Sequence, residues 1–217
     1  MQSPLARVLA AALDEIASVP TPSPGAQPVP AAVLVGLDAQ PELAAPAQAL
    51  DEVRVVLTRR RPGLRRHAGE ISFPGGRWEV ADGTLYETAL REVDEEIGLS
   101  AEEVAPLGAL HAVPTIATNY LIYPFVGLVE LTARGVGEAG AEDPSRAPLP
   151  RWQISAHEVD EVLELSLGEI QAGRGRTQLE RRGFHFETDT FTVGEHLIWG
   201  ATFRILEDLL RRISGGG

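Results

Sequence analysis

The chain contains no cysteine, which excludes disulfide bonds, thiolate metal sites and cysteine nucleophiles. It also lacks an apolar run close to the length of about 18 residues that a membrane-spanning helix needs. Its net charge of −12 disfavours nonspecific binding to nucleic acid, which depends on basic contacts with phosphates. The apolar N-terminus, residues 1–17, carries Asp14 and Glu15 and lacks the basic start of a secretory signal. We therefore expect a cytoplasmic protein that binds neither nucleic acid nor membrane.

The length of 217 residues is large for one domain but short for two, and the hydrophobic fraction of 44% is sufficient for a core. Residues 1–30 are expected to form an N-terminal helix and a linker. Ser3 has the character of an N-cap, Pro4 suits the first helical position, and residues 21–30 are rich in Pro, Ser and Gly. The remaining residues, 31–217, are expected to form one domain.

Hydrophobic patterning predicts strands and helices that do not alternate regularly. Strands are expected at residues 32–37, 53–58, 70–73, 107–113 and 121–131, and a hairpin at 177–179 and 184–191. Helices are expected from Thr84 to Gly98, from Ser155 onward, and over 197–213, because Thr84 with Glu87 and Ser155 with Glu158 each give a capping-box pattern. Residues 134–150 are rich in Gly and Pro and predict a loop. This order favours an α+β fold, with a mixed β-sheet between helices in an α/β/α sandwich.

The helix expected at 84–98 carries four acidic residues within the five positions 92–96. Glu92, Glu95 and Glu96 are spaced i, i+3 and i+4, so they share one helix face. Like charges at this spacing destabilise a helix by roughly a few tenths of a kcal/mol per pair. A cation bound between them reverses that effect, and hard divalent ions prefer carboxylate oxygens. The pattern predicts a divalent metal site that handles phosphates.

A second charged cluster precedes this helix, with six basic residues in the nine positions 59–67. Arginine binds phosphate oxygens in pairs, so this segment is a candidate phosphate-binding site. The alternative is a solubilising strand edge and loop.

The glutamate cluster resembles the signature of the Nudix hydrolases. Gly76 and the residues 91–99, Arg-Glu-Val-Asp-Glu-Glu-Ile-Gly-Leu, match the glycine and the second half of that signature at every specified position. The first glutamate of the family pattern has no match, because the intervening loop is one residue longer. Counted back from Arg91 its position holds Gly83, and counted forward from Gly76 it holds Asp82.

A narrower resemblance lies upstream, to the coenzyme A diphosphatase subgroup. Residues 57–60, Leu-Thr-Arg-Arg, are followed by Arg65 and by the Phe-Pro-Gly-Gly sequence at 73–76. The departures from the subgroup motif are Val56 for Leu, Arg61 for Ser and Glu79 for Asp.

The resemblance implies that residues 31–217 form a Nudix domain that hydrolyses a diphosphate with Mg²⁺ or Mn²⁺. The implied substrate is anionic coenzyme A or its thioesters, and the products are 4′-phosphopantetheine, or its acyl form, and 3′,5′-ADP. Glu92 and Glu96 are the implied metal ligands, with the carbonyl of Gly75 or Gly76. Glu95 is a further ligand or positions the attacking water.

The remaining expected site residues are basic. Arg91 completes the catalytic set and is expected to hold the loop by ion pairing. Arg60, Arg65 and Arg77 are the expected substrate-binding residues, and the first two are candidates for the 3′-phosphate of coenzyme A.

Several alternatives remain open from the sequence. The substrate can be another nucleoside diphosphate derivative such as ADP-ribose, or the chain can be a noncatalytic nucleotide-binding domain. Glu158 can supply a catalytic carboxylate from a second loop or act only as a helix cap. Trp78 can stack on adenine or serve packing. The general base and the oligomeric state stay undetermined.

Overall fold

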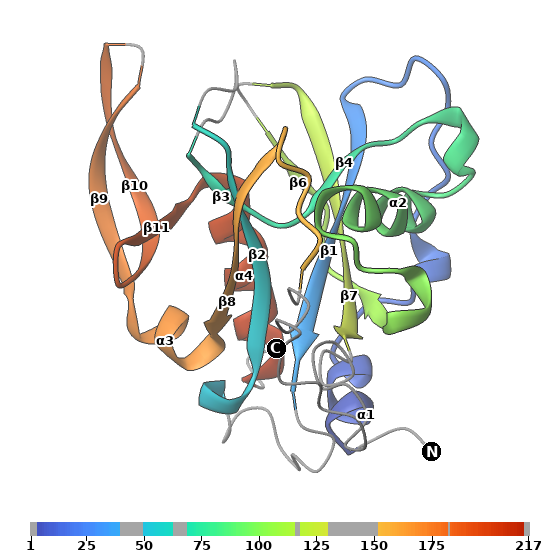
Figure 1. Cartoon of the computed structure of the whole chain (residues 1–217), viewed down its shortest axis with the longest axis horizontal. Coiled ribbons are helices and arrows are strands. Elements are labelled where there is room, and N and C mark those ends of the chain that lie inside the picture. Colours follow the sequence, from blue (N-terminus) through green and yellow to red (C-terminus); the bar gives the residue numbers. More distant parts are fainter. Residues whose placement is uncertain are drawn as a thin grey trace, which may run out of the picture.

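The computed structural model describes residues 4–39, 50–62, 69–115, 118–129, 152–181 and 183–214, and within them it contains two β-sheets (Figure 1). The strands of the main sheet are β1 (Val29–Asp38), β2 (Arg54–Arg60), β3 (Ile71–Ser72), β4 (Gly75–Arg77), β5 (Val104–Ala109), β6 (Val113–Pro114), β7 (Tyr120–Val129) and β8 (Val159–Ser166). The second sheet contains β9 (Arg174–Arg181), β10 (Phe184–Val193) and β11 (His196–Trp199). The α-helices are α1 (Pro4–Ala11), α2 (Leu85–Ile97), α3 (Leu167–Ala172) and α4 (Gly200–Ile213).

The main sheet is mixed. Its central strand β1 runs parallel to β7 and antiparallel to both β2 and β4. The strand order is β3-β2-β1-β7-β5, and β8 pairs with β2 on the same sheet. The mixed β-sheet predicted from the sequence is thereby confirmed.

Helices cover both faces of this sheet. Successive residues of β1 point to opposite faces, so Val33, Val35 and Leu37 belong to one apolar cluster while Ala32 and Leu34 belong to another. The first cluster includes the buried residues of α4, and the second includes those of α2. The main sheet therefore lies between α2 and α4, as the α/β/α prediction requires.

Helix α2 begins and ends as its sequence predicts. The Thr84 hydroxyl accepts a hydrogen bond from the Glu87 N–H at 3.2 Å, and the Glu87 carboxylate accepts one from the Thr84 N–H at 2.8 Å. At the other end Gly98 adopts φ +68°, and its N–H donates to the Asp94 carbonyl at 2.8 Å. Each end thus satisfies backbone groups that the helix leaves unpaired.

The helix predicted from Ser155 is wrong. The N–H groups of Glu158 and Val159 both donate to the Ser155 carbonyl, which closes a single turn, and β8 then begins at Val159. Leu163 and Leu165 are buried at a spacing of two, and β8 pairs with β2 along its length. Apolar residues at 159, 162 and 163 fit a helix and a strand equally well, so tertiary pairing decides.

Two other boundaries differ from the prediction. The segment 107–113 is divided between β5 and β6, and the closing helix begins at Gly200 rather than near 197. Leu197 and Ile198 instead pair with Thr192 and Phe191 in the second sheet. Their side chains fit the apolar spacing of a helix, but their backbone forms a strand because it pairs with β10.

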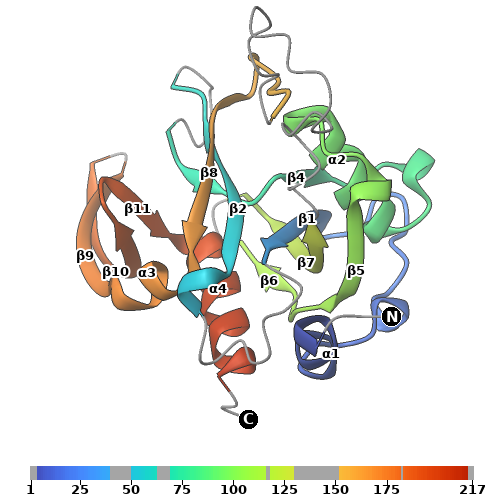
Figure 2. The same ribbon diagram turned by 60° about the horizontal axis from the view of Figure 1, so that its bottom comes forward.

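The N-terminal helix α1 lies beside β5, and Leu9 is buried in the cluster that includes α4 (Figure 2). The predicted N-cap Ser3 and the predicted loop 134–150 lie outside the described residues. The domain boundary at residue 30 stays a prediction. No helix among the described residues is long and apolar enough to cross a membrane.

Candidate active site

Helix α2 presents its three glutamates to very different surroundings. Of the Glu96 side chain 5% is exposed, of Glu92 17%, and of Glu95 60%. Glu92 and Glu96 are one helical turn apart and lie against Gly76 and Gly75 of β4, whereas Glu95 lies toward solvent. The helix face inferred from spacing therefore carries one buried carboxylate, one partly buried carboxylate and one exposed carboxylate.

Glu96 is held by groups from two other strands. The N–H of Gly75 donates to its carboxylate at 3.2 Å, and the Arg60 guanidinium at the end of β2 lies 3.7 Å away. Burial raises the pKa of Glu96 to about 8, although Arg60 and the Gly75 N–H act to lower it. The charges of Glu92 and Glu158 raise it further.

Glu158 lies within electrostatic reach of both buried glutamates. Burial raises the pKa of Glu92, Arg91 opposes that rise, and the charges of Glu95 and Glu158 add to it. The turn that carries Glu158 is attached to the end of α2, because the Ser155 N–H donates to the Glu96 carbonyl at 2.8 Å. The wrongly predicted helix therefore becomes a turn that brings a third carboxylate to this site.

Asp82 takes the position that the family signature leaves open. It ends the short 3₁₀ helix η4 (Val80–Asp82), and only 4% of its side chain is exposed. Arg91 donates to its two oxygens from Nε at 2.6 Å and from Nη2 at 3.1 Å, and Thr88 donates from its hydroxyl at 2.9 Å. A forked arginine–carboxylate pair is among the stronger side-chain interactions. Asp82, and not Gly83, is thus the residue of this loop that pairs with Arg91.

Arg91 joins the loop, α2 and β4. In addition to Asp82 it lies 3.0 Å from Glu92 and 3.2 Å from Glu95, and it donates to the Arg77 carbonyl at 3.2 Å. The hydrogen bond to Asp82 raises the pKa of Arg91 further above its usual range. Through these contacts Arg91 links the loop that carries Asp82 to α2 and β4.

Two glycines allow β4 to approach the glutamates. Gly75 has φ +150°, and a Cβ there would lie 2.3 Å from the Ala32 carbonyl oxygen. A Cβ on Gly76 would lie 2.2 Å from a carboxylate oxygen of Glu92. Only glycine leaves room for the Glu92 carboxylate against the strand.

Replacing Gly76 with Ala is expected to displace the Glu92 carboxylate and to lower kcat by about 100-fold, the scale of a 1 Å misplacement at a reacting centre. Hydrolysis rates with Mn²⁺ and a thermal unfolding curve measure the effect. Gly175→Ala on β9 is the matched control, because the nearest atom to its added Cβ lies at 3.9 Å. Unchanged turnover in Gly76→Ala would show that the close approach has no catalytic purpose.

The donor set fits a divalent cation chemically, although its side chains are paired with arginines. Burial raises the pKa values of Glu92 and Glu96, and the charges of neighbouring carboxylates raise them further, so a bound cation would favour the ionised form of both. Across the described part of the chain, no three acidic or histidine side chains are grouped closely enough to hold a metal ion. Arg91 and Arg60 occupy the positions beside the two glutamates instead.

The predicted substrate-binding arginines have different locations. Arg60 lies at the glutamates, and Arg77 is exposed on β4 with its carbonyl bound by Arg91. Arg65 lies outside the described residues. The neighbouring Arg59 points elsewhere, because its guanidinium contacts His196 at 2.8 Å and Glu161 at 3.4 Å.

Sequence reasoning did not assign a role to Asp82 and gave Glu158 only as one of two alternatives. Two features of the sequence could have indicated the role of Asp82. It stands at the position of the first family glutamate when residues are counted forward from Gly76, and Thr88, one turn into α2, offers a hydroxyl to bind it. For Glu158 the capping-box pattern pointed to a local role, and only the pairing of β8 with β2 shows where the turn lies.

Comparison with known proteins identifies a family. The model of the NUDIX domain matches residues 42–172. A protein named uncharacterized Nudix hydrolase NudL from Klebsiella pneumoniae strain 342 is 31% identical over 161 residues, which are 73% of this chain and 74% of that protein. A relative of the same name from Salmonella newport strain SL254 has the same identity and coverage.

Solved structures give more distant likenesses. A Nudix hydrolase from M. smegmatis, RenU, is 17% identical with a TM-score of 0.44, and the match covers 66% of this chain and 74% of that one. The NUDIX domain of Shewanella oneidensis NrtR, solved as a complex with ADP ribose, is 16% identical with a TM-score of 0.44, covering 72% and 84%.

Proposed function

The chain belongs to the NUDIX domain family and is a hydrolase of phosphorus-containing acid anhydrides in nucleoside diphosphate derivatives, and from this premise we propose that its substrate is coenzyme A or one of its thioesters. The products are then 4′-phosphopantetheine, or its acyl form, and 3′,5′-ADP. The observation that carries the proposal is the contact of Arg60 with Glu96 at 3.7 Å. Arg60 belongs to the subgroup motif and Glu96 to the family signature, so the two resemblances meet at one site.

In the proposed site Glu92 and Glu96 bind Mg²⁺ or Mn²⁺ through their carboxylates. The Gly75 N–H donates to the Glu96 carboxylate at 3.2 Å, so the Gly75 backbone lies against this side chain. We take the Gly75 carbonyl as the third proposed protein ligand. A divalent cation bound there neutralises charge on the diphosphate and lowers the pKa of a bound water.

The surrounding residues bind the substrate and hold protons. Arg60 is the proposed donor to a diphosphate oxygen, because a cation held by Glu96 would weaken the ion pair between Glu96 and Arg60. Arg77 and Arg65 remain proposed contacts to more distant phosphate. Glu95 and Glu158 are the two candidates to accept the proton of the attacking water, and the charge of Glu158 acts on both buried glutamates.

Hydrolysis of coenzyme A tests the proposal directly. With Mn²⁺ or Mg²⁺ we expect equal amounts of 3′,5′-ADP and 4′-phosphopantetheine by chromatography, and a higher kcat/KM than for ADP-ribose or a dinucleoside polyphosphate. Arg60→Ala is expected to raise KM by about tenfold or more, because a charged hydrogen bond to phosphate is lost. Arg54→Ala, on the same strand and exposed, is the control.

The alternatives predict different results. A higher kcat/KM for ADP-ribose assigns the site to another Nudix substrate. Binding of coenzyme A without turnover, over several metals and pH values, favours a noncatalytic nucleotide-binding domain. The cytoplasmic location stays a prediction.

A further inference from the structure

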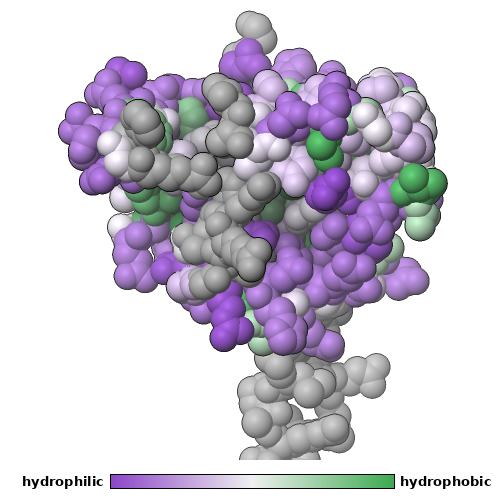
Figure 3. All heavy atoms as spheres, turned by 90° about the horizontal axis from the view of Figure 1, so that it is seen from above, coloured by the Kyte–Doolittle hydropathy of each residue, from purple (hydrophilic) through white to green (hydrophobic). Residues whose placement is uncertain are grey.

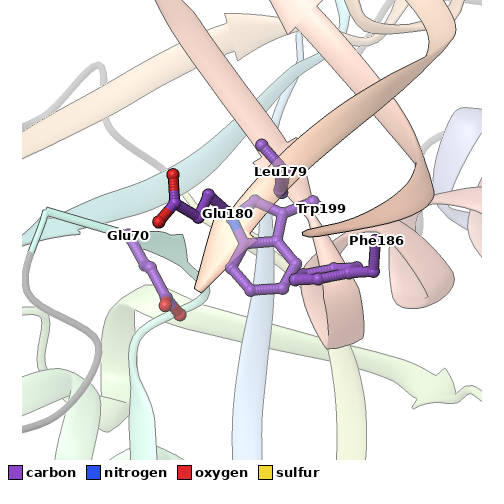
Figure 4. A pocket seen from close by; sticks show the side chains of 5 residues that line it. All are labelled: Glu70, Leu179, Glu180, Phe186 and Trp199. Carbon is purple, nitrogen blue, oxygen red and sulfur yellow. The ribbon is translucent and has the colours of Figure 1, made fainter. Parts of the chain in front are cut away.

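A hollow of about 180 Å³ lies between β3 and the second sheet (Figure 4). Its lining residues are Glu70, Leu179, Glu180, Phe186 and Trp199. The Trp199 and Phe186 rings are in contact, with centroids 6.0 Å apart and planes inclined by 51°. In Figure 4 the indole lies between the two carboxylates on one side and the Phe186 ring on the other. The hollow thus combines an aromatic wall with a rim of two acids.

Most of this hollow comes from outside the region that the family model matches. That model ends at residue 172, whereas Leu179, Glu180, Phe186 and Trp199 belong to the second sheet. Only Glu70 comes from the matched region. The second sheet stands beside α4 in Figure 2, so the hollow adds a surface that lies mostly beyond the matched region.

The lining favours one kind of ligand. The two carboxylates that line the hollow are hydrogen-bond acceptors, so the hollow suits a ligand with hydrogen-bond donors better than it suits the phosphate groups of the substrate. Carboxylates accept hydrogen bonds from N–H donors, and an indole face stacks on planar rings. A volume of about 180 Å³ is below the range of roughly 300–1,000 Å³ that whole drug-sized ligands occupy, so it suits a single ring system.

The hollow is close to the glutamate site. The Arg60 N–H donates to the Glu70 carbonyl at 3.0 Å, and the pairing of Thr58 with Ser72 and Arg59 with Ile71 places Arg60 opposite Glu70. Opposite residues of an antiparallel pair lie on one face of the sheet, with Cβ atoms about 5 Å apart. Arg60, whose side chain reaches Glu96, therefore lies directly beside Glu70, whose side chain lines the hollow.

We propose that this hollow binds a purine base that carries an exocyclic amino group, stacked on Trp199 with its amino group donating to Glu70 or Glu180. This proposal rests on the proposed function in one respect: if the substrate is coenzyme A, the bound base is its adenine. The sequence left Trp78 open as an adenine-stacking or a packing residue. Trp78 packs against the apolar cluster that includes α2, whereas Trp199 lines the hollow.

The binding test uses the full-length protein without metal. The chain has three tryptophans, so their indole N–H signals in ¹⁵N NMR spectra can be assigned with Trp199→Phe. Adenosine is expected to shift the Trp199 signal, and inosine, which lacks the amino group, is expected to bind about tenfold more weakly. Pantetheine is the third probe. A shift of the Trp199 signal with pantetheine and not with adenosine, or equal affinity for adenosine and inosine, overturns the proposal.

Substitutions at the rim locate the contact. Glu70→Ala or Glu180→Ala is expected to weaken adenosine binding about tenfold and to abolish the preference over inosine. Glu187→Ala on β10, which is exposed and pairs with Arg176 at 3.4 Å, is the matched control. Glu180 is exposed, so its substitution is informative even if changes at Trp199 impair folding. Adenosine affinity equal to the control in both variants contradicts the proposal.

Kinetics separate this proposal from the proposed function. Trp199→Ala is expected to raise KM for coenzyme A about tenfold, the scale of lost base stacking, with little change in kcat. Turnover of coenzyme A that is unaffected by Trp199→Ala leaves the proposed function in place and rejects the base site. Adenosine binding at Trp199 in a protein that does not hydrolyse coenzyme A supports the base site and rejects the proposed function.

Discussion

Glu96→Gln is expected to lower kcat by about three orders of magnitude while leaving the fold intact. Loss of one group that stabilises developing charge in a buried site has effects of this scale. Glu96 is the most buried of the three glutamates, and its charge would meet a cation between α2 and β4. Glutamine keeps an oxygen that can accept the Gly75 N–H, so the local structure has no reason to change.

The same substitution is expected to stabilise the metal-free protein at alkaline pH. The pKa of Glu96 is raised from 4.5 to about 8 in the folded state, mainly by burial. A raised carboxyl pKa means that stability from this group is present below pH 4.5 and is lost as the pH rises toward 8. Glutamine does not ionise, so Glu96→Gln is expected to flatten that part of the stability profile.

Urea unfolding in a chelating buffer at pH 5 and pH 8.5, together with kcat at saturating Mn²⁺, measures both effects. Glu102→Gln, an exposed glutamate on another element, is the matched control and is expected to change neither. If Glu96→Gln keeps near-normal turnover, Glu96 is not a metal ligand. If its dependence of stability on pH is unchanged, burial does not raise the pKa of Glu96.

Asp82→Ala is expected to lower the free energy of unfolding by about 3 kcal/mol, the scale of breaking a buried ion pair from one side. Asp82 is almost fully buried and receives two hydrogen bonds from Arg91 and one from Thr88. Its removal leaves the Arg91 guanidinium without its best partner and frees it to pair more strongly with Glu92 at 3.0 Å. A fall in turnover is therefore expected to accompany the loss of stability.

The acid side of the stability profile tests the same pair. Burial acts to raise the pKa of Asp82, but hydrogen bonds from Arg91, the Glu79 N–H and Thr88 prevail and lower it below 3.8. Stability from a lowered carboxyl pKa is present above pH 3.8 and is lost as the pH falls below it. Asp82→Ala is expected to lose this part of the acid dependence.

Thermal and urea unfolding from pH 7 to pH 3 measure both consequences, with Asp94→Ala as the control. Asp94 lies on α2 as well, but its side chain is exposed. If Asp82→Ala and Asp94→Ala have the same free energy of unfolding, the pair of Asp82 with Arg91 contributes nothing to stability.

Local signals in the sequence were sufficient for α2. Thr84, Glu87 and Gly98 fix its ends through contacts within four residues, and the apolar spacing fixes its buried face. The spacing of Glu92 and Glu96 follows from the helix alone. The chemical character of the site could therefore be inferred before any tertiary contact was known.

The segment around Ser155 shows where local signals fail. Its capping-box pattern and apolar spacing suit a helix, yet its backbone pairs with β2 from Val159 onward. A strand partner about a hundred residues away in sequence leaves no mark within the segment. For the same reason the sequence offered Glu158 as a cap or a catalytic group without deciding where it lies.

The sequence by itself determined the family and the acidic helix and predicted the divalent-metal chemistry, because each depends on residues within a few positions of one another. The tertiary structure alone decided that Asp82 rather than Gly83 pairs with Arg91, that Arg60 and not Arg59 faces Glu96, and that Trp199 lines a hollow. The direction of a strand side chain depends on register, and a shift of one residue reverses it. Register is set by partners distant in the chain, so it is established only when the sheet forms.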